Sequence, residues 1–111
     1  MAIREQPSLR QILYFRNIAE LGSFRRAAEK LGITQPTMTA QIATLERILG
    51  FKLFERSRHG VALTPAGREL LPNAMRLEEE MQGFMDVAAG LTGMGSATYR
   101  MGVTPTLGPY L

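Results

Sequence analysis

The run Thr34-Gln35-Pro36-Thr37 contains the side chains of this sequence that are best suited to recognition by hydrogen bonding. The amide of Gln35 can pair with an adenine edge or with a phosphate. The short hydroxyls of Thr37 and Thr39 can reach a phosphate or a thymine methyl group, and Ala40 allows close approach. The group therefore predicts contacts with a nucleic acid. Read singly, Gln35 and Thr37 are equally typical of an ordinary protein surface.

A second group of candidate contacts is basic and lies further along the chain, at Arg56, Arg58 and His59. Residues 1–64 carry ten lysines and arginines against five glutamates, a net charge of +5, whereas residues 65–111 carry three against five acids, a net charge of −2. A basic N-terminal part predicts a polyanionic partner for that part of the chain only. The alternative is a solvated surface, which is the usual setting of charges at a turn.

Few residues in the chain could support other kinds of chemistry. There is one histidine, one aspartate and no cysteine, so neither a disulfide framework nor a cysteine-type zinc site is expected. His59 has no orienting partner nearby in the sequence, which argues against an enzyme. No cofactor or metal is predicted. No run is apolar enough for a membrane span or a secretory signal, so we expect a cytoplasmic protein without a membrane partner.

Three helices should hold these side chains, over residues 9–21, 24–31 and 35–49. Each begins after a residue suited to N-capping and ends before a glycine suited to the C-terminal position; these pairs are Ser8 and Gly22, Ser23 and Gly32, and Thr34 and Gly50. Pro36 fits the first turn of the third helix. The apolar stripe of that helix is opposite a small, polar, nearly acid-free face formed by Pro36, Thr39, Ala40, Ala43 and Arg47.

The hydrophobic pattern changes to the period of a strand after Gly50. Residues 51–56 and 61–63 predict two strands joined by a turn at 57–60, which is a hairpin with a basic tip. Thr64 and Pro65 then predict the start of a fourth, long helix that runs to about Leu91, with a bend at Pro72. Its heptad seam predicts a surface that pairs two copies: Leu70, Ala74, Leu77, Met81, Phe84, Ala88 and Leu91.

The segment after Leu91 differs in character from the helices before it. Residues 92–96 are predicted to form a flexible connector, 98–103 a strand and 104–109 a loop. One isolated strand cannot bury a core, so we expect the chain to end just inside a second domain. The predicted domains are therefore 7–64, with a helix-turn-helix at about 24–43, then a linker helix at 65–92, and a hinge with the start of a further domain at 93–111.

Residues 9–67 resemble the N-terminal domain of the LysR-type transcriptional regulators. The similarity rests on many fixed spacings: Gly22-Ser23-Phe24, Ala27-Ala28, Leu31, Gln35-Pro36-Thr37, Gln41-Ile42, Leu45-Glu46, Leu49-Gly50, Leu53-Phe54-Glu55-Arg56, Leu63-Thr64 and Ala66-Gly67. Ala40 departs from the family pattern, where arginine is common, and this lowers the expectation of a guanine contact there. Arg16 departs from a usually small apolar residue. Arg25-Arg26 and residues 105–109 are similar to the peroxide-sensing branch.

The resemblance implies a mainly α protein, a winged helix-turn-helix of three helices and a β-hairpin wing, followed by a long dimerisation helix. It implies a sequence-specific transcription factor that binds operator DNA as a homodimer, with a tetramer left open for a longer protein. An effector would bind only in a domain beyond this chain. The implied DNA-binding residues, from the third helix and the wing, are Thr34, Gln35, Pro36, Thr37, Thr39, Ala40, Arg56, Arg58, His59 and Thr64.

A protein-interaction module is the remaining alternative, in which the helix seam is the function and the basic part only a solubilising surface. Salt dependence separates these alternatives. DNA binding should weaken steeply with salt because phosphate contacts release counterions, whereas hydrophobic pairing should not.

Overall fold

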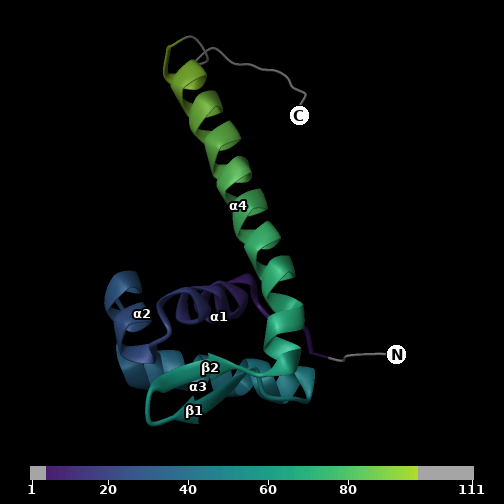
Figure 1. The fold of residues 1–111 in the computed structure, drawn as a ribbon. Coiled ribbons are helices and arrows are strands. Elements are labelled where there is room, and N and C mark those ends of the chain that lie inside the picture. The colour runs from purple at the N-terminus through teal and green to yellow at the C-terminus, as the bar shows by residue number, and fades with distance from the viewer. Residues whose placement is uncertain (1–4, 98–111) are drawn as a thin grey trace. The chain divides into compact units, whose positions relative to one another are not determined.

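The computed structural model describes residues 5–97, and the surroundings of side chains up to residue 92. The elements are α1 (Leu9–Leu21), α2 (Phe24–Leu31), α3 (Gln35–Leu49), β1 (Phe54–Ser57), β2 (Gly60–Leu63) and α4 (Pro65–Ala97) (Figure 1). The two strands form one antiparallel hairpin. This arrangement confirms the predicted mainly α fold, a winged helix-turn-helix followed by a long helix. The chain divides into two compact units after Glu78.

The first three helices begin and end at the residues that their capping patterns predict. Ser8, Ser23 and Thr34 each have extended backbone geometry and accept a hydrogen bond from the amide three residues later. Ser8 forms a full capping box with Gln11. The three helix-ending glycines adopt the left-handed conformation. Short-range hydrogen bonding therefore sets these boundaries.

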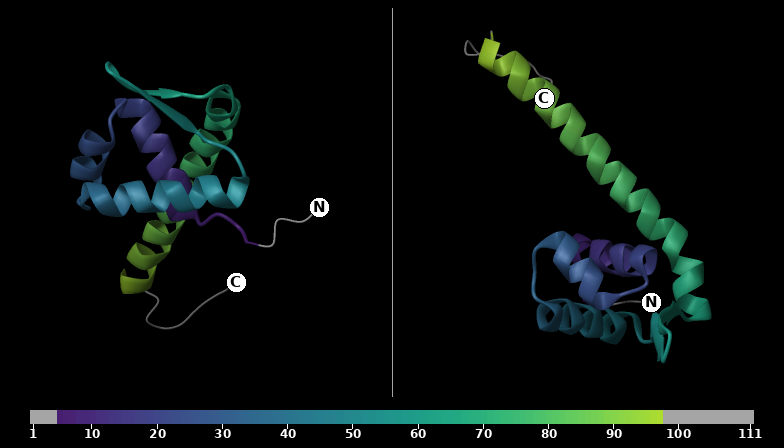
Figure 2. Two further views of the ribbon diagram at one scale, coloured as in Figure 1. Left: turned by 90° about the horizontal axis from the view of Figure 1, so that it is seen from below. Right: turned by 60° about the vertical axis from the view of Figure 1, so that its left-hand side comes forward.

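One hydrophobic core holds α1, α2, α3 and the hairpin together (Figure 2). Ile18, Met38, Leu45 and Leu53 are its largest fully buried side chains. The ring of Phe54 from β1 contacts two rings from the helices, with centroids 5.6 Å from Phe15 and 5.5 Å from Phe24. Such tilted contacts favour one orientation of the rings. The hairpin is therefore attached to the helices at its first strand.

The first strand starts later than the hydrophobic pattern predicts, at Phe54 instead of Phe51. The amide of Leu53 is used elsewhere, because it donates to the Glu46 carboxylate on α3 at 2.8 Å. The Leu53 carbonyl accepts from the Thr64 amide at 3.0 Å, which continues the hairpin register by one pair. Phe51 is 42% exposed. Residues 51–53 thus connect α3 to the hairpin.

Helix α4 is longer than predicted. It remains helical through Pro72 and extends past Leu91 to Ala97, so the prediction of a connector at residues 92–96 is wrong. The Thr92 hydroxyl donates to the Ala88 carbonyl at 3.0 Å, a bond that threonine commonly makes within a helix. The strand predicted at 98–103 and the loop at 104–109 lie outside the described residues.

Candidate nucleic-acid interface

The turn between α2 and α3 sets the direction in which α3 begins. Gly32 has a φ of 72°, a backbone conformation that is energetically unfavourable for any residue with a Cβ atom. The amide of the next residue, Ile33, donates to the Ala28 carbonyl at 3.0 Å. Ile33 packs against the hydrophobic core. Only two residues, Ile33 and the cap Thr34, then separate this glycine from α3. The helix-turn-helix geometry predicted for 24–43 follows from this tight, anchored turn.

The N-terminus of α3 has a local hydrogen-bond arrangement that orients its polar side chains. The Thr34 hydroxyl accepts from the Thr37 amide at 3.3 Å and is 2.8 Å from the Thr37 hydroxyl, to which it donates. Because a hydroxyl accepts and donates at once, Thr37 retains its own proton for an outside acceptor. Gln35, Pro36 and Thr37 are exposed. The first turn of α3 therefore presents free donors together with the positive end of the helix dipole.

The exposed side of α3 remains free of acidic groups beyond its first turn. Ala40 and Ala43 are exposed, while Thr39 is half-buried. The carboxylate of Glu46, the first acidic residue of α3, is only 13% exposed and accepts from the Leu53 amide. Further along, Arg47 pairs with Glu5 at 2.9 Å. The N-terminal half of α3 can thus approach a polyanion without charge repulsion.

A shallow hollow separates α3 from the hairpin strand β1. Its lining includes Thr39 and Ala43 from α3, Arg56 from β1, and Lys52 from the connecting segment. The hollow thereby brings together two of the predicted contact residues, Thr39 and Arg56, that are far apart in the sequence. A phosphate group approaching this edge would meet the Thr39 hydroxyl and the Arg56 guanidinium, together with Lys52, against the carboxylates of Glu46 and Glu55 that line the same hollow.

Arg56 is held in place by an aromatic ring. Its guanidinium carbon is 4.8 Å from the centre of the Phe24 ring, a cation–π distance. The Phe24 ring is itself fixed by its edge contact with Phe54. Nothing in the local spacing of the sequence links residues 24 and 56. The side chain of Arg56 is thus oriented before any ligand binds.

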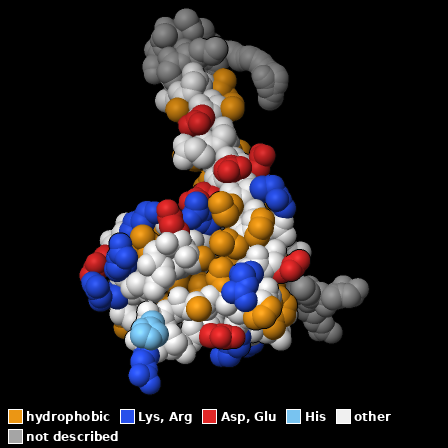
Figure 3. All heavy atoms as spheres, in the orientation of Figure 1, with side chains coloured by type: hydrophobic (Ala, Val, Ile, Leu, Met, Phe, Trp, Pro, Cys, Tyr) orange, Lys and Arg blue, Asp and Glu red, His pale blue; other side chains and the backbone are white. Residues whose placement is uncertain are grey.

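Arg58 and His59 occupy the exposed tip of the hairpin, as predicted. The Ser57 hydroxyl accepts from the His59 amide at 3.2 Å and so stabilises the turn. Among the described residues, neither Arg56 nor Arg58 forms a salt bridge, whereas Arg25 pairs with Glu29 at 2.9 Å. Basic side chains gather over the part of the surface where Figure 1 places α2 and the hairpin end (Figure 3). The hairpin end therefore carries positive charge that is not neutralised locally.

Two further observations change the set of candidate contacts. Arg26, on the exposed side of α2, also has no salt bridge to a described residue, and sequence analysis did not separate it from its paired neighbour Arg25. Thr64 is only 8% exposed; its hydroxyl donates to the Lys52 carbonyl at 2.8 Å and accepts from the Gly67 amide at 3.0 Å. The structure thus uses the Thr64 hydroxyl to begin α4, and Thr64 also lines the same hollow as Arg56; its contact with phosphate stays a prediction.

The predicted dimerisation seam of α4 divides into two parts. Ala74 is 3% exposed and belongs to the core, so it has almost no surface left for a seam between copies, and Leu70 is half-buried against that core. Both are covered because the first part of α4 packs on the helix-turn-helix unit. Further along, the seam residues Leu77, Phe84 and Leu91 are 41%, 73% and 62% exposed, and Met81 and Ala88 are half-buried.

Residues 9–68 match the family described as bacterial regulatory helix-turn-helix proteins of the lysR family. The chain belongs to the LysR family. A probable hydrogen peroxide-inducible genes activator of Mycobacterium xenopi is 41% identical over 106 residues, which cover 96% of this chain and 56% of that protein. Its counterpart in Mycobacterium avium is 42% identical over 96% of the chain but only 34% of its own length. The LysR chain thus spans between a third and just over half of these relatives.

Solved structures of LysR proteins have the same fold. The oxidised form of Corynebacterium glutamicum OxyR is 40% identical over 81% of this chain and 28% of its own, with a TM-score of 0.77. The DNA-binding domain of BenM, in complex with catB site 1 DNA, is 34% identical over 77% of this chain and 96% of its own, with a TM-score of 0.71. The family domain predicted from the sequence is therefore confirmed.

The described part of the chain has neither a membrane-spanning helix nor a cluster of metal-binding side chains. Residues 5–97 contain no helix long and apolar enough to cross a membrane. Nor do they bring together three acidic, histidine or cysteine side chains that could hold a metal ion.

Proposed function

We propose that this LysR chain binds double-stranded DNA by inserting the N-terminal part of α3 into the major groove. The observation that carries the proposal is the exposed, acid-free first turn of α3, where Gln35 and Thr37 keep side-chain donors on either side of Pro36. A recognition helix enters the groove with its N-terminal residues leading. The BenM domain, with which this chain shares its fold, is described in complex with DNA.

The hairpin acts as a wing that contacts the DNA backbone. Arg56 is oriented by the Phe24 ring, and Arg58 and His59 extend from the tip. Because a guanidinium with no intramolecular counterion keeps its charge available, these groups favour phosphate over water. Thr39 adds a hydroxyl beside Arg56 in the hollow. Backbone contacts of this kind fix the register of α3 but carry no sequence information by themselves.

The functional form is a homodimer formed through the second part of α4. Phe84, Val87 and Leu91 are each more than 60% exposed, and no other part of the described chain covers them. Leu77, Met81, Phe84, Ala88 and Leu91 repeat at alternating steps of four and three, the spacing by which two helices pack together. A second copy of α4 is therefore the natural occupant. The family resemblance implies that the two helices are antiparallel.

The role is transcriptional regulation, not catalysis. The single histidine of the chain, His59, is exposed at a hairpin tip, and there is no cysteine to act as a nucleophile. We place the action in the cytoplasm because the bacterial chromosome lies there. Any thiol chemistry of the kind that the names of the peroxide-inducible relatives suggest would need residues outside these 111.

Selection of bound duplexes from a random DNA pool tests the proposal. We expect enrichment of a pseudo-palindromic sequence, because a two-fold dimer presents two copies of α3 to two half-sites. Binding of the selected duplex should weaken steeply as salt rises. Failure to enrich any sequence, with affinity insensitive to salt, would instead favour a module that pairs only with protein.

A further inference from the structure

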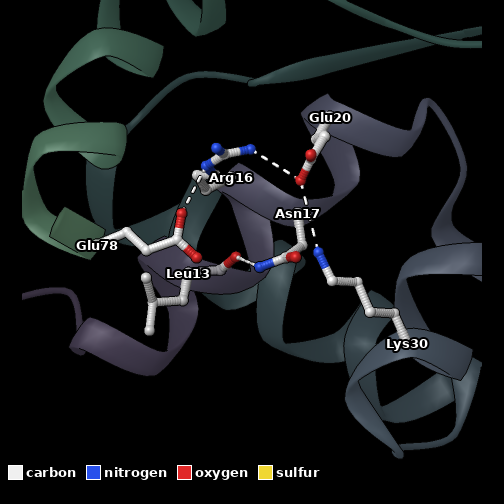
Figure 4. Close-up of polar contacts among 6 residues, drawn as sticks. All are labelled: Leu13, Arg16, Asn17, Glu20, Lys30 and Glu78. Carbon is white, nitrogen blue, oxygen red and sulfur yellow. Dashed lines mark hydrogen bonds and ion pairs between the residues drawn. The ribbon is translucent and has the colours of Figure 1, made fainter. Parts of the chain in front are cut away.

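A line of four charged side chains joins three helices of the first compact unit (Figure 4). Lys30, in the last turn of α2, has its Nζ 3.6 Å from Glu20 Oε1 on α1. The same oxygen is 2.9 Å from Nη1 of Arg16, and Nε of Arg16 is 2.7 Å from Glu78 Oε1 on α4. Ion pairs therefore connect the end of the first helix of the helix-turn-helix with the long helix.

Arg16 is the central member of this line. Its side chain is only 21% exposed, and its Nε is buried without an aligned hydrogen-bond acceptor among the described residues. The contact with Glu78 is therefore a close charge pair, not a well-directed hydrogen bond. Because a buried guanidinium nitrogen needs a counter-charge, loss of the Glu78 carboxylate would leave Nε without one and the guanidinium with Glu20 as its only ion-pair partner among the described residues. Arg16 is also a position at which the sequence departs from the small residue common in the family.

Glu78 lies at the boundary between the two compact units, part-way along α4. It is the last residue that the first compact unit includes, and residues 79–97 continue the same helix. At 1.5 Å per residue this continuation is about 28 Å long, so a change of about 20° at Glu78 would move its far end by about 10 Å. Half-sites of a two-fold dimer are about 34 Å apart or a multiple of that distance. Such a displacement is a substantial fraction of the spacing.

We propose that Arg16 is a positioning residue that holds the first part of α4 against α1 and thereby sets which half-site spacing a dimer accepts. The proposal rests on the proposed binding of DNA by a dimer. Arg16 need not touch DNA in this role. It acts through Glu78 on the helix that joins the two copies, and through Glu20 on Lys30 at the end of α2.

The test compares the intact chain with Glu78→Gln and with Arg16→Met, which keeps an apolar stem and removes the charge. The probes are duplexes selected by the wild type, carrying either one half-site or two half-sites at a series of separations. For both variants we expect half-site affinity close to wild type. The ratio of the affinity at the best half-site separation to the affinity at neighbouring separations should fall by about two- to fivefold. This fold-change corresponds to the free energy that a partly exposed ion pair contributes.

Glu79→Gln is the matched control, because it removes the same charge from an exposed position on the side of α4 away from the seam, with no salt bridge among the described residues. It should leave the spacing preference unchanged. An unaltered preference in Glu78→Gln overturns the proposal. So does a parallel loss on half-site and two-site DNA, because that pattern indicates only a less stable fold. A wild type that binds no two-site DNA overturns the proposed function and this inference with it.

A second measurement does not depend on DNA. The chain has no cysteine, so Ala62→Cys and Ala89→Cys, both at exposed positions, allow clean attachment of two spin labels. With labelled chains diluted into unlabelled protein, we expect the distribution of distances within one chain to broaden when Glu78→Gln is added. Equal widths with and without Glu78→Gln overturn the proposed positioning role, whatever the binding data show.

Discussion

Replacing Phe84 with aspartate should convert the proposed dimer to monomer. Phe84 is 73% exposed in the single chain, so most of its surface is available for burial against a second copy. A phenylalanine of about 200 Å² then offers about 150 Å², worth about 3.7 kcal/mol at about 25 cal/mol per Å². In a two-fold dimer Phe84 is buried once from each copy, so the loss is about 7 kcal/mol, which weakens dimerisation by about 10⁵-fold even before the cost of two unpaired carboxylates.

Sedimentation velocity over a range of protein concentrations measures this effect directly. We expect wild type to sediment as a dimer and Phe84→Asp as a monomer at tens of micromolar, with single half-site binding preserved. Ala89→Asp is the matched control: residue 89 is exposed and lies about 140° around the helix from residue 84. The same charge at this position should leave the dimer intact.

Two results would refute the reasoning. One is a Phe84→Asp variant that remains a dimer with unchanged affinity, because the seam would then not be the interface. The other is a wild type that is monomeric at tens of micromolar and still binds a two-site duplex tightly. Either result would leave the exposed apolar face of α4 for a different partner.

Three further predictions concern the DNA face and the core. Gln35→Ala should lower affinity for the selected site by about 1–3 kcal/mol with little change on random DNA, as measured by competition binding; equal losses on both would make Gln35 a backbone anchor. Arg58→Ala should weaken binding to all sequences and reduce the slope of log affinity against log salt by about one unit, and an unchanged slope would count against the contact. Gly67→Ala should destabilise the fold by about 2–3 kcal/mol in urea, because its Cβ would overlap the Leu53 carbonyl oxygen and lie 3.0 Å from Leu63 Cδ2. The control Gly83→Ala, with nothing within 4 Å, should be neutral or stabilising by about 1 kcal/mol, and equal effects of the two would contradict this account.

Much of the candidate interface could be predicted because its elements are defined by neighbours in the sequence. Thr34 caps α3 through an amide three residues away, and Gly32 ends α2 through its own backbone conformation. The exposure of Pro36 and Ala40 followed from the helical period of the buried residues Met38 and Ile42. Interactions over three or four residues can be read from spacing alone.

The contacts that orient the basic residues could not be predicted in this way. Phe24 positions Arg56 across more than thirty residues of sequence, and Arg16 meets Glu78 across more than sixty. Which charges remain free for a ligand depends on where the other elements lie.

The sequence by itself determined the three capped helices, the basic hairpin and the membership of the LysR family, because caps, periods and fixed spacings are local properties. Only the tertiary structure decided how α4 is used. A heptad pattern shows that Leu70, Ala74, Phe84 and Leu91 share one helix face, but not what covers them. Ala74 is buried in the core of its own chain, while Phe84 remains exposed. The physical reason is that an apolar side chain gains the same free energy from any dry partner, so the pattern requires burial without specifying the surface that provides it.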